Sequence, residues 1–247
     1  MRRMTDLHCH ILPNVDDGAG GMEIAVSMAR MAWDSGVGTI VATPHCNLPG
    51  EVRKNYISDG LARRYAEFQR VLRQQNIPLR VVPGGEVFWS EEVPALFQRG
   101  LFPTIADSRY LLVEFDFDVP AGKIDRALNE LSKQGVTPVV AHPERYSAVQ
   151  RSPELIVPWF EKGYVIQLNK GTILGKMGRD SERTAEFILR HGLAHVVASD
   201  AHSASYRTPH MKEIYSYLET EYSPEYASVL LVENPHHIVF NQGLVPV

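Results

Sequence analysis

Residues 135–141, GVTPVVA, show the unit from which the fold of this chain is built. Two other stretches are near-copies of it, GVGTIVA at 36–42 and GLAHVVA at 192–198. Each is a glycine followed by an apolar, largely β-branched run that ends in alanine, which is typical of a buried strand in a parallel sheet. The glycine suits the C′ position of a preceding helix. The repeat therefore predicts helices that alternate with parallel strands.

Apolar residues at helical spacing precede each of these three strands. They are Ile24, Met28 and Met31 before the first, Ile124, Leu128 and Leu131 before the second, and Ala185, Ile188 and Leu189 before the third. Two further helices are indicated by Leu61, Tyr65, Phe68 and Leu72, and by Leu155, Ile156, Trp159 and Phe160. Apolar runs at residues 5–10, 79–82, 110–115 and 164–168 predict four more strands, so about seven strands alternate with helices.

We expect residues 1–247 to form a single α/β domain, a distorted TIM-like (β/α)7 barrel with one short or irregular unit. An open doubly wound sheet is the alternative. Such a sheet usually carries a glycine-rich phosphate loop, and the sequence contains neither G-x-G-x-x-G nor G-x-x-x-x-G-K-[ST]. In a barrel, the functional residues follow the carboxyl ends of the strands.

The composition is that of an ordinary globular protein, with 44% hydrophobic and 22% charged residues. A formal net charge of −4 offers no basic field for nucleic acid. The basic start, residues 1–4, leads into Asp6 and His8 rather than into an apolar segment, so we expect neither a signal peptide nor a membrane span. The expected location is the cytoplasm.

Cys9 and Cys46 form no C-x-x-C motif, and we interpret them as reduced packing residues. A thiol-based tyrosine phosphatase needs an arginine six residues after its cysteine. Val15 and Val52 stand at those positions, which excludes that class.

The stretch DLHCH at 6–10 places two histidines one residue apart. Side chains alternate along a strand, so His8 and His10 should share one face, with Leu7 and Cys9 on the other. Alone, such a pair is a weak signal, because short motifs recur by chance. Imidazoles and carboxylates also follow the other predicted strands, however, in the segments DDG at 16–18, TPH at 43–45, GGE at 84–86, Glu114, HPER at 142–145 and SDAH at 199–202.

Buried charges at so many strand ends are costly unless they are paired or bind metal. About nine candidate ligands exceed what one zinc ion uses, so two or three ions that share a carboxylate are expected. Histidine and carboxylate ligands without thiolate suit zinc, manganese or iron. The remaining histidines are interpreted as structural or solvated: His191, His195, His210, His236 and His237.

Together these segments resemble the polymerase and histidinol phosphatase (PHP) family, whose fold is a distorted seven-stranded barrel with a trinuclear metal site. HILP at 10–13 and DDGA at 16–19, with HPER and SDAH, are similar to the bacterial manganese-dependent protein-tyrosine phosphatases of the CpsB type, which act in capsule and exopolysaccharide synthesis. The resemblance runs from residue 5 to residue 241, nearly the whole chain.

The resemblance implies a set of ligands for each of three ions. His8, His10, Glu86 and Asp200 would hold the first, Glu86, Glu114 and His142 the second, and Asp17, His45 and His202 the third. Arg145 and Arg207 would bind the substrate phosphate, and with Asp200 they are the expected catalytic residues. The sequence does not decide whether Asp17 or Asp16 is the ligand. It also leaves open whether Lys170 contacts the phosphate or lies on the surface.

The implied activity is hydrolysis of phosphotyrosine on a protein, for example the tail of a bacterial tyrosine kinase. Two or three divalent ions are expected, manganese first and iron or zinc as alternatives. A histidinol-phosphate phosphatase would use the same metals, a 3′-5′ exonuclease would need a basic groove that the composition does not indicate, and a non-catalytic docking module would be expected to have lost ligands. Whether the chain forms a homo-oligomer stays open.

Overall fold

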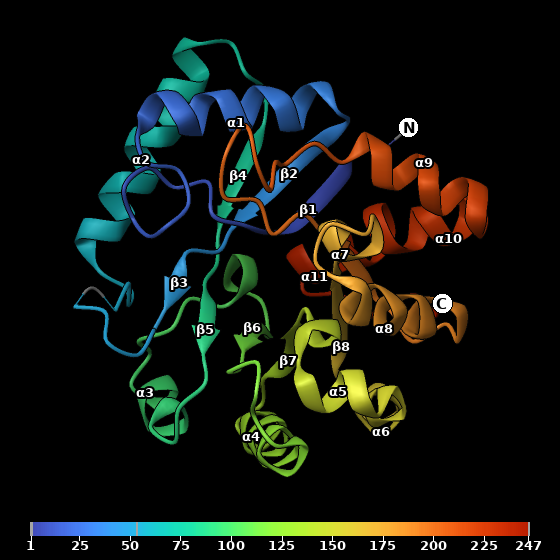
Figure 1. Ribbon diagram of the computed structural model, residues 1–247. Coiled ribbons are helices and arrows are strands. Elements are labelled where there is room, and N and C mark those ends of the chain that lie inside the picture. The colour runs from blue at the N-terminus through green and yellow to red at the C-terminus, as the bar shows by residue number, and fades with distance from the viewer. Residues whose placement is uncertain (1, 53, 247) are drawn as a thin grey trace.

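The computed structural model describes residues 2–52 and 54–246, and its strands form two parallel sheets (Figure 1). The first sheet has the order β1 (Met4–Cys9), β2 (Val37–Ala42) and β4 (Arg80–Pro83). The second has the order β3 (His45–Cys46), β5 (Glu86–Phe88), β6 (Tyr110–Glu114), β7 (Thr137–Ala141), β8 (Val165–Asn169) and β9 (Val196–Ala198). Every predicted strand is present. The short strands β3 and β5 were not predicted.

Two interruptions separate the predicted strands β2 and β4 from the short, unpredicted strands that follow them. Thr43 and Pro44 separate β2 from β3, and Gly84 and Gly85 separate β4 from β5. A Cβ at Gly84 would lie 2.6 Å from Cγ1 of Val41, so the chain can pass there only without a side chain. Proline cannot donate to a sheet ladder, which favours a break at 44. Each strand therefore begins in one sheet and ends in the other.

The first and last strands meet through their carboxyl ends. Cys9 and Ala201 form an isolated parallel bridge, the Asp200 amide donates to the His8 carbonyl oxygen at 2.8 Å, and the His10 amide donates to the Ala201 carbonyl oxygen at 2.8 Å. The strands thus follow one another around a ring in chain order, with the longer helices outside it (Figure 1). This arrangement agrees with a distorted barrel.

The side chains of the first strand do not alternate as expected. Between Asp6 and Cys9 the strand advances three residues against two residues of β2, which is a β-bulge. Leu7 therefore packs with Val41, Val139 and other strand residues in an inner apolar cluster, while Cys9 belongs to the outer core beneath the helices. The prediction that Leu7 and Cys9 share a face was wrong for this reason.

The five predicted helices all form, and their bounds are α1 (Met22–Asp34), α2 (Asp59–Gln74), α4 (Ala121–Lys133), α6 (Ile156–Glu161) and α8 (Arg179–Arg190). The structure adds α3 (Val93–Gln98), α5 (Ser147–Arg151), α7 (Lys170–Ile173), α9 (Lys212–Glu221), α10 (Pro224–Ser228) and α11 (Asn234–Val239). Single turns of other helix types occur at η1 (Ile105–Asp107), η2 (Pro143–Arg145) and η3 (Pro153–Leu155), and a π-helical segment at η4 (Val229–Glu233).

The helix ends and faces follow from local chemistry. Gly36, Gly135 and Gly192 follow α1, α4 and α8 with φ of 100°, 83° and 64°, the left-handed conformation expected of a C′ glycine. The apolar face of α4 is buried as predicted. In α1, by contrast, Ile24 is 43% exposed, because the helix buries the stripe formed by Ala25, Met28, Ala29 and Ala32.

Within residues 2–52 and 54–246, no helix combines the length and apolar composition that crossing a membrane requires.

His195 gives the fold a dependence on pH. Its ring stacks on Phe160 with centroids 4.5 Å apart, and the Ile166 amide donates to its Nδ1 at 3.1 Å. Burial lowers the pKa of His195 from 6.5 to about 4. Because the unfolded chain takes up this proton first, the free energy of unfolding should fall as the pH drops from 6.5 towards 4, by roughly 3 kcal/mol.

The variant His195→Asn keeps an acceptor near the Nδ1 position and does not titrate in this range. We expect metal-free wild-type protein to lose more stability than His195→Asn over that pH interval, as measured by urea denaturation. Equal losses in the two proteins would contradict a buried, neutral His195.

Candidate metal centre

Nine side chains from the strand ends form one group, here called the histidine–carboxylate cluster. Its members are His8, His10, Asp17, His45, Glu86, Glu114, His142, Asp200 and His202. Every predicted ligand therefore lies in one place. The imidazole rings contact one another, with centroids 3.9 Å apart for His10 and His202 and 5.7 Å apart for His8 and His142. None of the five other histidines is among the ligand groups of the described residues.

Glu86 occupies the middle of the cluster. Its Oε1 lies 3.1 Å from Nε2 of His8 and 3.0 Å from Nε2 of His142. Its Oε2 lies 3.3 Å from Nε2 of His10 and 2.9 Å from Nδ1 of His45. Each carboxylate oxygen thus faces two imidazoles, which is the geometry required of a ligand shared between ions.

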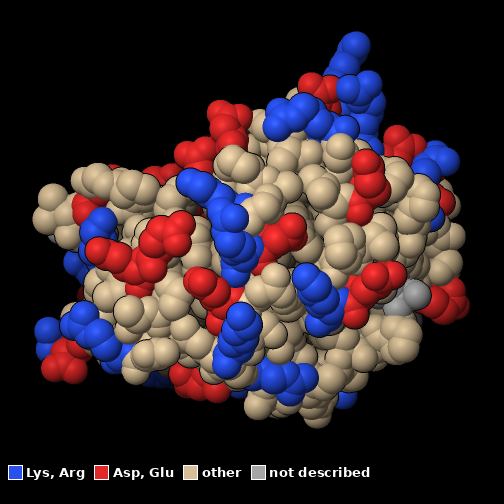
Figure 2. All heavy atoms as spheres, turned by 90° about the horizontal axis from the view of Figure 1, so that it is seen from below, with Lys and Arg blue, Asp and Glu red and all other residues tan. Residues whose placement is uncertain are grey.

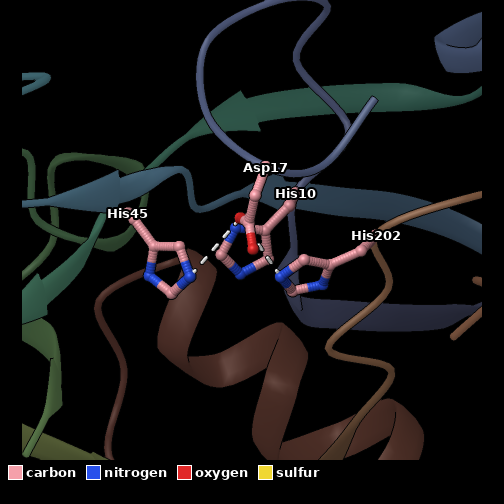
Figure 3. Close-up of side chains that lie close together, drawn as sticks. All are labelled: His10, Asp17, His45 and His202. Carbon is pink, nitrogen blue, oxygen red and sulfur yellow. Dashed lines mark ion pairs between the residues drawn. The ribbon is translucent and has the colours of Figure 1, made fainter. Parts of the chain in front are cut away.

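The two aspartates that sequence reasoning could not separate have different surroundings. Asp17 descends from its loop with its carboxylate between His45 and His202, at 3.6 Å and 3.5 Å from their Nε2 atoms (Figure 3). Asp16 instead accepts from Nδ1 of His10 at 2.7 Å and from the His45 amide at 2.9 Å. Asp17 is the one that offers an oxygen to the cluster, and Asp16 orients the ring of His10.

The ligand atoms converge in four overlapping groups. They are His10, Asp17, His45 and His202; His8, His10 and Asp200; His8, Glu86 and His142; and His45, Glu86 and Glu114. Three of them contain most of the three sets implied by the family resemblance. The groups differ from those sets in that Glu86 is absent from the group with His8, His10 and Asp200, and Glu114 is absent from the group with His142. Four residues, His8, His10, His45 and Glu86, each belong to two groups.

Charges within the cluster compensate one another. Burial opposes the charged forms of Glu86 and Asp200, yet the nearby His8 imidazole, with His45 for Glu86 and Arg207 for Asp200, holds the pKa of each carboxyl below its usual range. The same carboxylates outweigh the burial of His8 and raise its pKa to about 9. Burial and the charge of Glu86 raise the pKa of Glu114 to about 8. The carboxylates therefore need positive charge close by.

Several ligand atoms have no other use within the described residues. Oε2 of Glu86, Oε2 of Glu114 and Nδ1 of His45 are buried, and although Oε2 of Glu86 and Nδ1 of His45 lie 2.9 Å apart, none of the three atoms makes a well-oriented hydrogen bond there. An unsatisfied buried carboxylate oxygen costs about 1–3 kcal/mol or more. Divalent cations with nitrogen and oxygen ligands would satisfy all three atoms, so the residues present fit a metal centre.

A layer of polar side chains fixes the ligands from behind, and sequence reasoning did not identify it. Oε1 of Gln167 lies 3.0 Å from Nδ1 of His8, and Nδ2 of Asn169 donates to Oδ2 of Asp200 at 2.6 Å. Asp6 accepts from the Ser199 amide at 2.9 Å. A signal was present, because Gln167 and Asn169 interrupt the apolar strand β8.

Glu144 and Lys170 support the loops around the cluster. Glu144 is fully buried and accepts from the Asn169 amide at 2.9 Å, and burial raises its pKa to about 7. Lys170 is also buried, and its Nζ donates to the carbonyl oxygens of Thr208 and, at 2.7 Å, His210. Lys170 is therefore not a surface residue, and it anchors the segment that follows Arg207.

Both predicted arginines lie beside Asp200. Nη2 of Arg207 is 2.6 Å from Oδ2 of Asp200, and Nη1 of Arg145 is 3.7 Å from the same oxygen. The other oxygen, Oδ1, faces His8 at 3.5 Å and His10 at 3.6 Å. The guanidinium groups, about a quarter exposed or less, thus border the cluster where an anion could reach both.

The cysteines are unsuited to nucleophilic catalysis. Cys9 and Cys46 are both buried and free. Burial raises the pKa of Cys46 to about 12 and that of Cys9 well above its usual value. Since the thiolate is the nucleophile, neither thiol is reactive at neutral pH.

A parallel barrel-like sheet with a buried histidine–carboxylate cluster at the strand ends defines a metal-binding α/β protein. This chain belongs to the family described as "Capsular polysaccharide synthesis, CpsB/CapC", which matches residues 4–240. It is 35% identical to the tyrosine-protein phosphatase YwqE of Bacillus subtilis over 242 residues, 98% of this chain and 93% of that one. It is 29% identical to the tyrosine-protein phosphatase CpsB of Streptococcus pneumoniae over 247 residues, 97% of this chain and 99% of that one.

Solved structures agree with these relationships. A structure described as "Crystal structures of YwqE from Bacillus subtilis and CpsB from Streptococcus pneumoniae, unique metal-dependent tyrosine phosphatases" matches with a TM-score of 0.91 and 34% identity, covering 99% of this chain and 97% of that one. The phosphotriesterase homology protein of Escherichia coli matches with a TM-score of 0.63 and 13% identity, covering 95% and 97%. The second match shows a shared fold alone.

The turn at residues 16–18 places Asp16 and Asp17 by passing very close to His10. A Cβ added to Gly18 would lie 2.1 Å from the carbonyl oxygen of His10 and 2.5 Å from its Cβ. We expect Gly18→Ala to lower the free energy of unfolding by about 1–3 kcal/mol, because the turn must move away from His10, and to weaken retention of divalent metal.

Gly20→Ala is the matched control, since a Cβ there would meet no heavy atom within 4 Å. Chemical denaturation and the metal content after dialysis would be compared for both variants. If Gly18→Ala behaves like Gly20→Ala, the close approach to His10 does not matter for the site.

Proposed function

We propose that this protein is a metal-dependent phosphomonoesterase that removes phosphate from tyrosine side chains of proteins. The observation that carries the proposal is the adjacency of the histidine–carboxylate cluster to two arginines across a single carboxylate, that of Asp200. Metal ions bound in the cluster and the guanidinium groups of the two arginines would both bind the oxygens of a phosphate group. The family membership and the tyrosine phosphatase relatives support the same activity.

Two or three divalent ions, with manganese expected first, would be held by the nine residues of the cluster. His8, His10, Glu86 and Asp200 would hold one, Glu86, Glu114 and His142 a second, and Asp17, His45 and His202 a third. When bound, such ions would neutralise the phosphate oxygens and lower the pKa of a water molecule towards neutrality.

The chain itself binds and orients the substrate. Arg145 and Arg207 present several N–H donors each to the phosphate, which fixes its orientation relative to the cluster. The tyrosine phenolate, with a pKa of about 10, is a tolerable leaving group. A water molecule activated by the bound ions would be the nucleophile, so no covalent phosphoenzyme would be needed. The buried thiols of Cys9 and Cys46 take no part.

The proposed physiological substrate is a tyrosine-phosphorylated protein of capsule or exopolysaccharide synthesis, in particular the tail of a bacterial tyrosine kinase. The name of the matched family supports this role. We also propose a cytoplasmic location, because kinase phosphorylation requires the ATP found there. Formation of a homo-oligomer stays a prediction.

The sister functions are less well supported. A 3′-5′ exonuclease needs an extended basic groove, and on the face shown in Figure 2 the described lysines and arginines are interspersed with aspartates and glutamates. Histidinol-phosphate hydrolysis would use the same cluster, and the exposed Phe117 beside Arg145 favours a substrate whose aromatic ring is bonded directly to the phosphate oxygen.

A substrate panel on one manganese-loaded preparation tests the proposal. We expect a higher kcat/KM for a phosphotyrosyl peptide than for a phosphoseryl peptide or histidinol phosphate, complete loss of turnover on chelation, and recovery on adding back a single metal. Preference for histidinol phosphate, or digestion of single-stranded DNA with weak phosphotyrosine activity, would assign the chain to a sister function. Activity that survives full metal removal would exclude the metal mechanism.

Variants separate metal binding from phosphate binding. Arg145→Ala and Arg207→Ala should keep the metals and lose about tenfold to a hundredfold in kcat/KM for phosphotyrosine, since each removes a charge-assisted contact worth about 1.5–3 kcal/mol. His8→Ala should lose at least one ion per chain by elemental analysis.

Arg183→Ala serves as the control, because Arg183 is exposed and pairs with the exposed Asp180 three residues earlier on the same helix. Wild-type kinetics in Arg145→Ala or Arg207→Ala would remove that arginine from the site. Loss of metal in either variant would give it a structural role instead.

A further inference from the structure

One aromatic side chain beside the cluster, that of Phe117, is partly exposed. Phe117 lies between β6 and α4 and is 40% exposed, whereas Phe115, two residues earlier, is 1% exposed. Single exposed apolar residues are common on proteins. Phe117 differs from such residues in its position next to Arg145 and His142.

The Phe117 ring is presented by a segment that is tied down on both sides. The Ser147 amide donates to the carbonyl oxygen of Phe117 at 2.8 Å, and the Ser147 hydroxyl donates to Oδ1 of Asp118 at 2.6 Å. The Asp118 amide in turn donates to Oδ1 of Asp116 at 2.9 Å. These contacts fix the backbone that carries the ring, so little backbone entropy remains to be lost when a ligand binds.

One face of the ring covers the phosphate-binding Arg145. The guanidinium carbon lies 4.4 Å from the centroid of Phe117, and Nη1 of the same guanidinium lies 3.7 Å from Oδ2 of Asp200. The ring centroid is also 6.1 Å from that of His142, a member of the cluster. If Arg145 holds the phosphate, the group esterified to that phosphate would therefore extend past this ring.

We propose that Phe117 forms the wall of a subsite that takes the phenyl ring of phosphotyrosine, and that it thereby selects aryl over alkyl phosphate esters. The inference rests on the proposed function and deepens it. Aromatic pairs attract at centroid separations of about 4.5–7 Å in offset or edge-to-face arrangements. The phenyl ring of a bound phosphotyrosine can reach Phe117, whereas the single methylene of phosphoserine offers nothing to contact it.

The test compares substrate classes in Phe117→Leu, which keeps an apolar side chain and removes the aromatic face. We expect kcat/KM for a phosphotyrosyl peptide to fall about threefold to tenfold, while that for β-glycerophosphate stays unchanged. Phe117→Tyr should restore the aryl preference. Phe240→Leu is the matched control, because Phe240 is 47% exposed and lies 5.3 Å from the guanidinium carbon of Arg80.

A binding measurement gives a readout that does not depend on turnover. Calorimetry on metal-loaded protein would compare benzylphosphonate with methylphosphonate, and the affinity ratio should fall by the same factor in Phe117→Leu. An equal loss for aryl and alkyl ligands would mean that Phe117 only positions Arg145 and would overturn the inference, as would unchanged ratios. If the wild-type protein hydrolyses no phosphotyrosine, the proposed function fails, and the phosphonate ratio still decides the role of Phe117.

Discussion

The structure depends on the burial of carboxylates at one end of the strand ring. Glu86, Glu114 and Asp200 are each less than a tenth exposed, and an unpaired buried carboxylate costs several kcal/mol. Apolar packing cannot offset that cost, since only positive charge and hydrogen-bond donors can. The fold therefore has to bring imidazoles, guanidinium groups and, as proposed, metal ions to the same place. Parallel strands in ring order do so, because all their carboxyl ends point the same way.

The irregular parts of the sheets also help to bring the side chains of the cluster together. The bulge in β1 sends Leu7 into the inner apolar cluster and leaves His8 and His10 with their Nε2 atoms 3.2 Å apart. The breaks at residues 43–44 and 84–85 carry the chain from one sheet into the other immediately before His45 and Glu86. Uninterrupted strands would keep these two side chains in the ladder of the first sheet. The distortion of the barrel is thus a requirement of the site.

The repeated apolar strands, their glycine-terminated helices and the full set of candidate ligands could be predicted from the sequence, because strand runs, helical spacing and strand-end polar residues are local patterns. The strand at His45–Cys46 is too short to show a period. Asp16 and Asp17 are chemically alike, and only the path of the turn separates their roles. The support that Gln167 gives to His8 arises between distant strands, so sequence spacing could not reveal the partner.

Asp200 joins the two halves of the candidate site within one side chain. Its Oδ1 faces the imidazoles, and its Oδ2 contacts Arg207 at 2.6 Å and Arg145 at 3.7 Å. The separation between the cluster and the guanidinium groups is therefore set by the width of one carboxylate, and any phosphate that contacts both must fit that spacing. Arg207 also donates through Nε to the Asp200 carbonyl oxygen at 3.2 Å, so it is held more firmly than Arg145. Arg145 has the longer contact to Asp200 and otherwise lies against the Phe117 ring, so its guanidinium can move more easily to fit a substrate. Arg207, with two contacts to Asp200, stays in place.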